Sequence, residues 1–248
     1  VMLTEKRYEL ILKLLDKKRS VTVPEIKDVL GVSESTIRRD LNALDKAGRL
    51  TKVFGGAVSS DGTFTGTEPS VAQKMELQQE EKRRIAQFAA GLIQPDDFVY
   101  LDAGTTTGYI LDYLPRSATF VTNAVSHAKR LAAAGNRVIL IGGELKGTTE
   151  AVIGSQAILT IQGYHFTKGF FGTNGVSKRH GFTTPDPNEA LVKQEAMRQT
   201  ERCYVLADSQ KFGMVSSVTF GVFEEATILT ETEPPEGFSG SKNIRVAK

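Results

Sequence analysis

Hydroxyl, glycine and acidic residues follow a short apolar run near the middle of the chain. The run 98–101 leads into DAGTTT (102–107), where a glycine permits close backbone approach and three threonine hydroxyls can donate hydrogen bonds. This chemistry suits a phosphate at the start of a helix. A Walker loop and a dinucleotide fingerprint are excluded, because the chain has no Gly-Lys pair and no G-x-G-x-x-G. Taken alone, the segment is equally well explained as an ordinary strand-to-helix turn with a threonine cap.

The same pattern recurs after five more apolar runs, at 119–121, 138–141, 169–171, 204–207 and 227–229. In an open parallel α/β sheet, ligands bind beyond the carboxyl ends of the strands, so the polar groups after these runs should converge on one pocket. The repetition favours a binding site over unrelated turns. The candidate residues that follow the runs are Thr122, Asn123, Gly142, Gly143, Glu144, Gly172, Asn174, Gly175 and Asp208.

Charged residues towards the C-terminus could complete such a site. In GFTTPDPNEALVKQEAM (181–197), a loop with two prolines leads into a predicted helix that carries Glu189 and Lys193 four residues apart. By composition alone, the preferred explanation is a surface ion pair worth ~0.3–0.5 kcal/mol. Alternatively, Asp186 and Glu189 bind sugar hydroxyls, while Lys193 and Lys211 of ADSQKFG (207–213) bind a phosphate.

Metal, thiol and cofactor chemistry are not expected. The histidines, His127, His165 and His180, lack metal-ligand spacing, and the single cysteine, Cys203, lies in an apolar run. We predict a cytoplasmic protein without a membrane partner, because no apolar run approaches ~20 residues and no signal-peptide pattern precedes the first helix.

The elements that must position these residues fall into two parts of different charge. The whole chain has a formal net charge of +2, whereas residues 1–58 carry a net +4 and residues 59–248 a net −2. Between them, SSDGTFTGTEPS (59–70) has the composition of a linker. We therefore expect a basic domain at 1–58, a linker at 59–75 and a larger domain at 76–248. In the larger part, a helix at 70–92 precedes alternating apolar runs and helix-like segments, which predicts an α/β fold.

Residues 1–58 are predicted to form a winged helix-turn-helix. Apolar residues recur at helical spacing at 4–17, with Thr4 a candidate N-cap, and a short second helix begins near Pro24 and ends at Gly31. A third helix is capped by Ser33 and ends at Gly48, and LTKVFGGAV (50–58) resembles the two strands of a basic wing.

The third helix carries side chains that read DNA grooves or bind phosphates. The candidate DNA contacts on this helix and the wing are Ser33, Ser35, Thr36, Arg38, Arg39, Asn42, Arg49 and Lys52. Asp40 can cap the helix or pair with a neighbouring arginine. The alternative is a three-helix docking module with a solvated basic surface.

SESTIRRDL (33–41), together with Gly55-Gly56-Ala57, resembles the DeoR family of bacterial sugar-operon regulators. The resemblance implies that this run is the recognition helix and that Ser35, Thr36, Arg38 and Arg39 contact DNA. The later motifs resemble the sensor domain of that family, which is related to ribose-5-phosphate isomerase and glucosamine-6-phosphate deaminase folds and binds phosphorylated sugars. These motifs are DAGTTT, Thr122-Asn123, Gly142-Gly143-Glu144, FFGTNGVS (170–177) and ADSQKFG.

Within the family, GTNGVS and GFTTPDPNEALVKQ are most similar to repressors of fructose-utilisation operons, whose effector is fructose 1-phosphate. The resemblance implies a ligand role for Asp102, Gly104, Thr105, Thr106, Thr107, Asn123, Asp186, Glu189, Lys193 and Lys211.

The leading hypothesis is thus a repressor, a homodimer or homotetramer on double-stranded operator DNA, whose affinity changes with a phosphorylated sugar. Two alternatives remain open. One is a sugar-phosphate isomerase or deaminase with an appended DNA-binding module, and the other is an architectural DNA binder.

Overall fold

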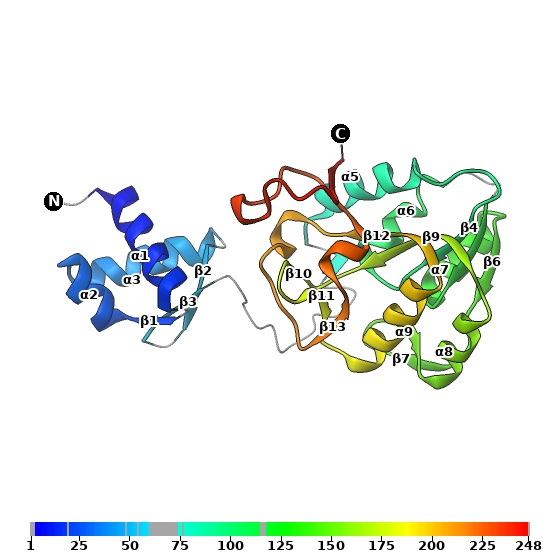
Figure 1. Ribbon diagram of the computed structural model, residues 1–248, viewed down its shortest axis with the longest axis horizontal. Coiled ribbons are helices and arrows are strands. Elements are labelled where there is room, and N and C mark those ends of the chain that lie inside the picture. The colour runs from blue at the N-terminus through cyan, green and yellow to red at the C-terminus, as the bar shows by residue number, and fades with distance from the viewer. Residues whose placement is uncertain are drawn as a thin grey trace. The chain divides into compact units, whose positions relative to one another are not determined.

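The computed structural model describes residues 3–18, 20–47, 49–53, 55–59, 74–75, 77–114 and 118–247. The chain forms two compact units, Val1–Phe64 and Thr65–Lys248, which we call the N-terminal and C-terminal domains (Figure 1). The predicted linker, 59–75, lies outside the described residues except for residues 59, 74 and 75. No helix within these described ranges is long and apolar enough to cross a lipid bilayer.

In its described residues, the N-terminal domain has three helices and a three-stranded antiparallel sheet. The helices are α1 (Thr4–Lys18), α2 (Val23–Leu30) and α3 (Glu34–Lys46), and the strands, in the order β1-β3-β2, are β1 (Ser20–Thr22), β3 (Gly56–Ser59) and β2 (Leu50–Val53). Apolar side chains at helical spacing meet in one core that includes Ile11, Leu15, Ile26, Ile37 and Leu41. The predicted winged helix-turn-helix is confirmed. The sequence pattern does not predict β1, which adds a third strand to the wing.

Local hydrogen bonds fix the turn between α2 and α3. Thr22 and Glu25 form a capping box at the start of α2. Gly31 ends that helix with φ +62°, a left-handed conformation that glycine adopts without steric cost. Ser33 then caps α3 by accepting a hydrogen bond from the Thr36 amide at 3.3 Å. The predicted roles of Gly31 and Ser33 in this turn are confirmed.

Two predicted helix ends differ from the structure. Thr4 lies inside the first turn of α1 instead of capping it, and its hydroxyl accepts a hydrogen bond from Arg7 at 3.3 Å. The helix α3 ends at Lys46 with Ala47 as its C-cap, whereas the predicted stop, Gly48, lies outside the described residues.

A buried ion pair ties α3 to α1. The Arg7 guanidinium donates to the two carboxylate oxygens of Asp40 at 2.6 and 2.9 Å, and the Asp40 side chain is only 3% exposed. The arginine partner of Asp40 thus comes from another helix. This pairing keeps a carboxylate away from the basic surface of α3.

The C-terminal domain is built on a seven-stranded parallel sheet with the order β15-β14-β12-β9-β4-β5-β6 (Figure 1). All six apolar runs predicted from the sequence are strands of this sheet, and β15 is the strand that the sequence pattern misses. The strands are β4 (Phe98–Leu101), β5 (Thr119–Thr122), β6 (Arg137–Leu140), β9 (Phe166–Gly172), β12 (Thr200–Leu206), β14 (Thr227–Thr230) and β15 (Ile244–Val246).

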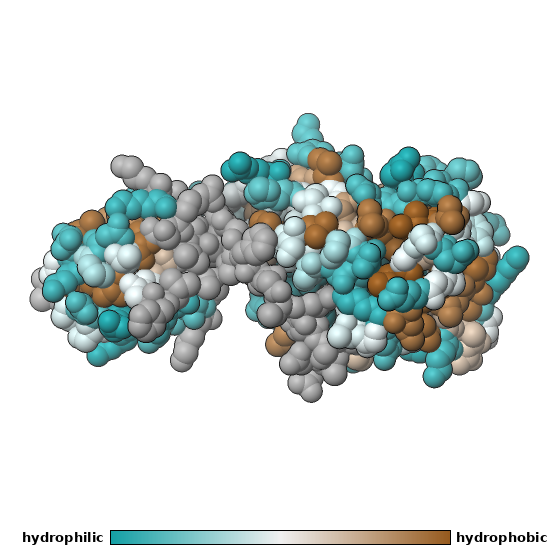
Figure 2. Space-filling view, turned by 90° about the horizontal axis from the view of Figure 1, so that it is seen from below, coloured by the Kyte–Doolittle hydropathy of each residue, from teal (hydrophilic) through white to brown (hydrophobic). Residues whose placement is uncertain are grey.

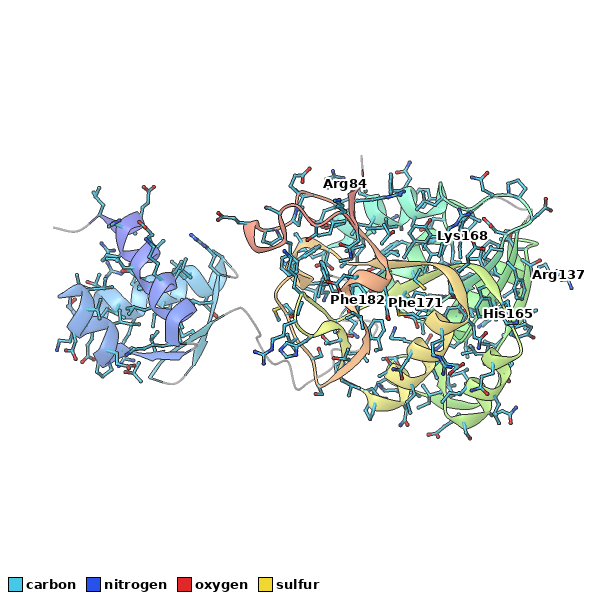
Figure 3. All side chains as sticks on the ribbon, viewed as in Figure 1. Arg84, Arg137, His165, Lys168, Phe171 and Phe182 are labelled. Atoms are coloured by element: carbon cyan, nitrogen blue, oxygen red, sulfur yellow. The ribbon has the colours of Figure 1, made fainter. Side chains whose placement is uncertain are left out.

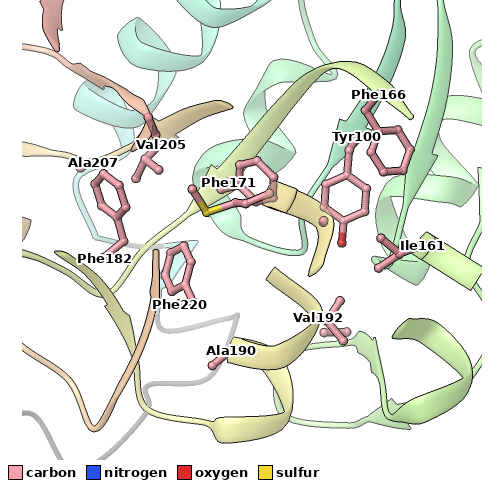
Figure 4. Packing of buried hydrophobic residues seen from close by; sticks show 14 of the residues in the cluster. Tyr100, Ile161, Phe166, Phe171, Phe182, Ala190, Val192, Val205, Ala207 and Phe220 are labelled. Carbon is pink, nitrogen blue, oxygen red and sulfur yellow. The ribbon is translucent and has the colours of Figure 1, made fainter. Parts of the chain in front are cut away.

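Helices and apolar cores cover both faces of the sheet. Side chains alternate along β4, so that Val99 and Leu101 enter one core while Tyr100 enters the other. The core around Tyr100 also contains Phe171 of β9 and Val192 of α9 (Figure 4). The helices are α5 (Gln79–Ala90), α6 (Thr105–Ile110), α7 (Val125–Ala133), α8 (Ser155–Gln162) and α9 (Pro187–Arg198). Burial on both faces explains why the strands are nearly continuous apolar runs.

The predicted helix at 70–92 is shorter in the structure, because α5 begins at Gln79. Residue 78 has φ +51°, outside the helical region, and residues 70–73 and 76 lie outside the described residues.

Two small antiparallel sheets follow β6 and β9. They are the hairpin of β7 (Glu144–Lys146) with β8 (Ala151–Ile153), and the sheet β10-β11-β13 of Gly175–Ser177, Gly181–Thr184 and Val218–Gly221. The described part of the domain also contains three short 3₁₀ turns, Ser209–Lys211, Phe223–Glu225 and Glu236–Phe238.

Candidate functional site

A pocket lies beyond the carboxyl ends of β4 and β9. Its cavity volume is about 70 Å³, and the pocket is open to solvent on one side. Eight predicted residues line it: Gly104, Thr105, Thr106, Gly172, Asn174, Glu189, Lys193 and Lys211. The lining also includes residues that the sequence did not single out as ligands, which are Lys74, Lys82, Ala103, Thr149 and Thr173. The lining contains four lysines and a single carboxylate, Glu189, so its charge favours an anion.

Asp102 and Lys193 form the buried base of the pocket. The Lys193 ammonium contacts Asp102 Oδ2 in a short hydrogen bond and the Gly172 carbonyl at 3.2 Å. Asp102 Oδ2 also accepts from the Gly172 amide at 3.0 Å, so the carboxylate joins β4, β9 and α9. Burial raises the pKa of Asp102, and the positive charge of Lys193 offsets this only in part. The ionised form of the fully buried Asp102 carboxylate therefore depends on the positive charge of Lys193.

The threonines of DAGTTT divide into two kinds. Thr105 and Thr106 line the pocket in the first turn of α6, where backbone amides have no intrahelical acceptor. Thr107 points away, and its hydroxyl donates to the carbonyls of Asp102 and Gly104 at 2.7 and 2.9 Å. Thr107 therefore does not line the pocket, and its hydroxyl holds the strand-to-helix turn together.

The neighbouring helix α7 supports α6 from behind. Arg130 donates to the Gly108 carbonyl at 2.9 Å, and a side chain at Gly108 would meet the His127 ring at 3.0 Å. Burial, together with the positive charge of Arg130, lowers the pKa of His127 to about 4, so this imidazole is neutral at physiological pH. The first turn of α6 is thus held rigidly at the pocket.

Lys82 joins the pocket to the segment that enters the domain. Its side chain is buried, and its ammonium donates to the Leu77 carbonyl at 2.6 Å and, in a shorter contact, to the Lys74 carbonyl. Burial lowers the pKa of Lys82, Asp208 raises it, and Lys211 and Lys74 lower it. A bound anion would stabilise the charged form.

Asp208 supports this lysine cluster from behind the lining. It is 3% exposed and caps the 3₁₀ turn that carries Lys211 by accepting from the Gln210 amide at 3.2 Å. Burial raises the pKa of Asp208, whereas Lys211 and Lys82 lower it. Glu231 accepts from the Ser209 amide at 3.1 Å and fixes the same turn.

Glu189 and Lys193 do not form the surface ion pair that composition favoured. Both are buried, because α9 turns this side towards the domain, and each has another partner. Glu189 accepts from Lys146 at 3.0 Å and from the Thr149 hydroxyl at 2.5 Å. Lys146 also pairs with Asp186 at 3.0 Å. The tip of the β7–β8 hairpin is thereby attached to the start of α9.

Asp186 caps α9 and is not part of the lining. Its carboxylate accepts from the amides of Asn188 and Glu189 at 2.8 and 3.0 Å. Burial raises the pKa of Asp186, but the Glu189 amide and Lys146 together lower it below its usual value.

Further predicted residues also lie outside the described lining, where they shape the loops. Asn123 accepts from the Ala103 amide at 2.9 Å, and Thr122 accepts from the Ala124 amide at 3.0 Å. The segment Gly142, Gly143 and Glu144 leads into β7, and Gly175 is packed so closely that a side chain would collide with the Met214 carbonyl. These residues do not line the pocket, contrary to the expectation that all polar strand ends would converge on it.

Lys82 belongs to the basic triplet Lys82-Arg83-Arg84, and nothing in this triplet indicates that the Lys82 side chain is buried. Lys74 and Thr149 reach the pocket from segments that carry no motif. Among the described residues, no group of histidine, cysteine and carboxylate side chains could hold a metal ion. Burial raises the pKa of Cys203 to about 12, which leaves its thiol protonated.

The N-terminal domain presents a polar, basic helix face. The side chains of Ser35, Arg38, Arg39 and Asn42 are exposed on α3, while Thr36 is half-buried. Lys52 of β2 donates to Asn42 Oδ1 at 2.6 Å, which links the wing to this face. Arg49 is also exposed, whereas the Ser33 hydroxyl is engaged with Ser35 and Thr36 at the start of the helix.

Comparison with known proteins gives consistent matches over both domains. Residues 7–63 match the DeoR-like helix-turn-helix domain, and residues 77–232 match the DeoR C terminal sensor domain. The chain is 41% identical to an uncharacterized HTH-type transcriptional regulator, FruR, of Bacillus subtilis (strain 168), over 100% of this chain and 98% of that protein. It is 34% identical to the lactose phosphotransferase system repressor of Streptococcus mutans serotype c, over 92% of each. Ribose 5 phosphate isomerase A from Neisseria gonorrhoeae matches 57% of this chain and 56% of its own, with 16% identity and a TM-score of 0.41.

Proposed function

The chain belongs to the DeoR family of transcriptional regulators, and we propose that it represses a sugar-utilisation operon under the control of a phosphorylated sugar. The observation that carries this proposal is the pocket beyond β4 and β9, whose lining combines four lysines, threonine hydroxyls and one carboxylate. The lysine ammonium groups suit a phosphate, and the threonine hydroxyls and the Glu189 carboxylate suit sugar hydroxyls.

On the DNA side, α3 is proposed to enter the major groove of double-stranded operator DNA. Arg38 and Arg39 can contact guanine or phosphates, and Asn42 can read adenine. Lys52 and Arg49 lie on the wing side, where they suit the phosphate backbone. Ser35 and Thr36 sit at the start of α3, whose positive dipole end also favours a phosphate.

On the effector side, the phosphate is proposed to lie among Lys82, Lys211 and the first turn of α6, with the hydroxyls towards Glu189 and Lys193. Fructose 1-phosphate is the favoured effector, because residues 181–194 resemble the corresponding segment of fructose-operon repressors. Lys193 retains its partner Asp102, so this end of the pocket is nearly neutral and suits hydroxyls better than a second phosphate.

The transmission of binding is proposed to run through Lys82. Its ammonium holds the carbonyls of Lys74 and Leu77, so an anion that draws on the same ammonium changes the stability of that entry segment. A coupling of about 1–3 kcal/mol would change operator affinity about 5- to 150-fold.

The test is an operator titration at fixed salt with fructose 1-phosphate, fructose 6-phosphate, fructose 1,6-bisphosphate and tagatose 6-phosphate. Thermal unfolding of the full chain supplies a second readout, since an effector at 100 times its Kd stabilises the domain by about 2.7 kcal/mol. Free fructose with inorganic phosphate is the control. An equal response to this mixture contradicts the proposed recognition of a phosphorylated sugar, and turnover of fructose 1-phosphate would favour the enzyme alternative.

Lys82→Met should abolish the thermal shift while operator binding without effector persists. The matched control is Lys178→Met, because Lys178 is an exposed lysine outside the lining of the pocket. An unchanged thermal shift in Lys82→Met would remove Lys82 from the proposed site.

A further inference from the structure

The hairpin of β7 and β8 is anchored in the core by one strand and exposed on the other. All three residues of β8 are buried, whereas Glu144 and Leu145 of β7 are exposed. The strand β7 lies on the same side of the C-terminal domain as α9 (Figure 1), and Figure 2, which views this side, shows hydrophilic and hydrophobic surface intermixed. The position of the hairpin is therefore set by β8, while β7 borders solvent.

Asn123 joins β8 to the segment that opens the pocket. Its side-chain oxygen accepts from the Ala103 amide at 2.9 Å, and its side-chain amide donates to the Val152 carbonyl at 3.2 Å. The Val152 amide donates in return to the Asn123 carbonyl at 2.7 Å. At the base of the hairpin, a side chain on Gly143 would lie 2.6 Å from the Ile153 carbonyl, so only glycine permits this close approach. The polar motifs that follow β5 and β6 thereby fix the hairpin relative to DAGTTT.

Two side chains near the tip of the hairpin hold Glu189. The Lys146 ammonium and the Thr149 hydroxyl donate to the same carboxylate oxygen, Oε1, at 3.0 and 2.5 Å. Lys146 also pairs with Asp186 at 3.0 Å. Thr149 and Glu189 both line the pocket, and Glu189 is the single carboxylate of the lining. Among the described residues, both donors to this carboxylate use Oε1, which leaves the acceptor capacity of Oε2 for a ligand.

Helix geometry offers Glu189 a different partner. Lys193 is four residues further along α9, the spacing at which opposite charges on a helix meet. Asp102 takes this lysine instead, and the negative charge of Glu189 contributes to the raised pKa of Asp102, so the two carboxylates lie close together. The buried Lys168 lies near the start of β9, where it pairs with Asp97 away from the pocket (Figure 3). The hairpin is therefore what keeps the Glu189 carboxylate from turning towards Lys193.

We propose that Thr149 is a specificity-determining residue of the pocket, which positions Glu189 to accept a hydrogen bond from a sugar hydroxyl, a role that rests on the function proposed above. The ammonium groups of Lys82 and Lys211 attract any phosphate monoester, whereas a fixed carboxylate oxygen recognises a hydroxyl that only the sugar part supplies. Without the Thr149 hydroxyl, the carboxylate turns towards Lys193. The pocket then keeps its attraction for phosphate and loses its preference for a phosphorylated sugar.

The test compares fructose 1-phosphate with methyl phosphate, a phosphate monoester without an alcohol group, in thermal-unfolding titrations of the full chain. Thr149→Val keeps nearly the same shape and removes the hydroxyl. It should weaken the binding of fructose 1-phosphate about tenfold and change the affinity for methyl phosphate by less than about twofold. Thr149→Ser retains a hydroxyl and should bind fructose 1-phosphate within about threefold of wild type. Thr148→Val is the matched control and should match wild type, because Thr148 is an exposed neighbour outside the lining.

A double-variant cycle separates positioning from direct contact, with far-UV circular dichroism verifying the fold of each variant. If Thr149 acts through Glu189, Thr149→Val should have no further effect on fructose 1-phosphate binding in a Glu189→Gln background. Additive losses, an equal loss for both ligands, or unchanged binding of fructose 1-phosphate by Thr149→Val would each overturn the role of Thr149 and leave the proposed function standing. Failure of wild type to bind fructose 1-phosphate would contradict the proposed effector and the role of Thr149 together.

Discussion

Replacement of Lys193 by methionine should expose how strongly Asp102 depends on its buried partner. The side chains of Lys193 and Asp102 are only 6% and 1% exposed. Methionine has similar length, so the variant removes the charge with little change in packing. Loss of one partner from a buried pair costs about 3–5 kcal/mol, because the remaining charge has neither water nor a counter-ion. The Gly172 amide, which still donates to Asp102, moderates this cost.

The loss should depend on pH in a definite direction. Burial already raises the pKa of Asp102 in the wild type, and removal of the lysine raises it further. The folded variant then binds a proton that the unfolded chain has released, so its stability falls as pH rises through the raised folded pKa. We therefore expect a smaller deficit relative to wild type at about pH 5 than at about pH 8.

The measurement is urea unfolding of the full chain at several pH values, followed by far-UV circular dichroism, since the chain has no tryptophan. The N-terminal domain is a separate unit, so its transition serves as an internal reference. In the double variant with Asp102→Asn, the pH dependence should disappear and much of the loss should be recovered. A deficit below about 1 kcal/mol, or one that is equal at both pH values, would refute the role assigned to the pair.

Three further outcomes test other parts of the molecule. Arg39→Ala should weaken operator binding, by about 1–3 kcal/mol if it reads a base, and leave effector binding intact in a thermal-shift assay; a joint loss would make Arg39 a folding residue. Asp40→Ala removes the carboxylate that joins α3 to Arg7 of α1 and should destabilise the N-terminal domain in chemical unfolding, without moving the transition of the C-terminal domain. His127 has a pKa of about 4 in the folded state, so up to about 3 kcal/mol of stability should be lost as pH falls from about 6.5 to 4. His127→Gln should remove this pH dependence, and an identical profile in the variant would contradict the assignment.

Short-range patterns in the sequence determined the helices of the N-terminal domain and six strands of the parallel sheet. Helical spacing of apolar residues, the cap at Ser33 and the glycine at Gly31 act over a few residues, so they specify the helix-turn-helix locally. In the same way, an apolar run followed by a polar segment indicates a buried parallel strand and the edge at which it ends. The resemblance of the motifs to the DeoR family extended this reading to a sensor domain.

The tertiary structure decided which polar groups reach the pocket. Thr105 and Thr107 are equivalent by motif, yet only Thr105 faces the pocket, because the turn of α6 directs the other hydroxyl to backbone carbonyls. Asp102 and Lys193 are separated by 91 positions, so no local pattern could pair them in preference to Glu189 and Lys193. The sequence determined where strands end and which chemistry gathers there. The partner of each buried charge was decided by tertiary packing, since burial makes an ion pair obligatory only after distant segments have met.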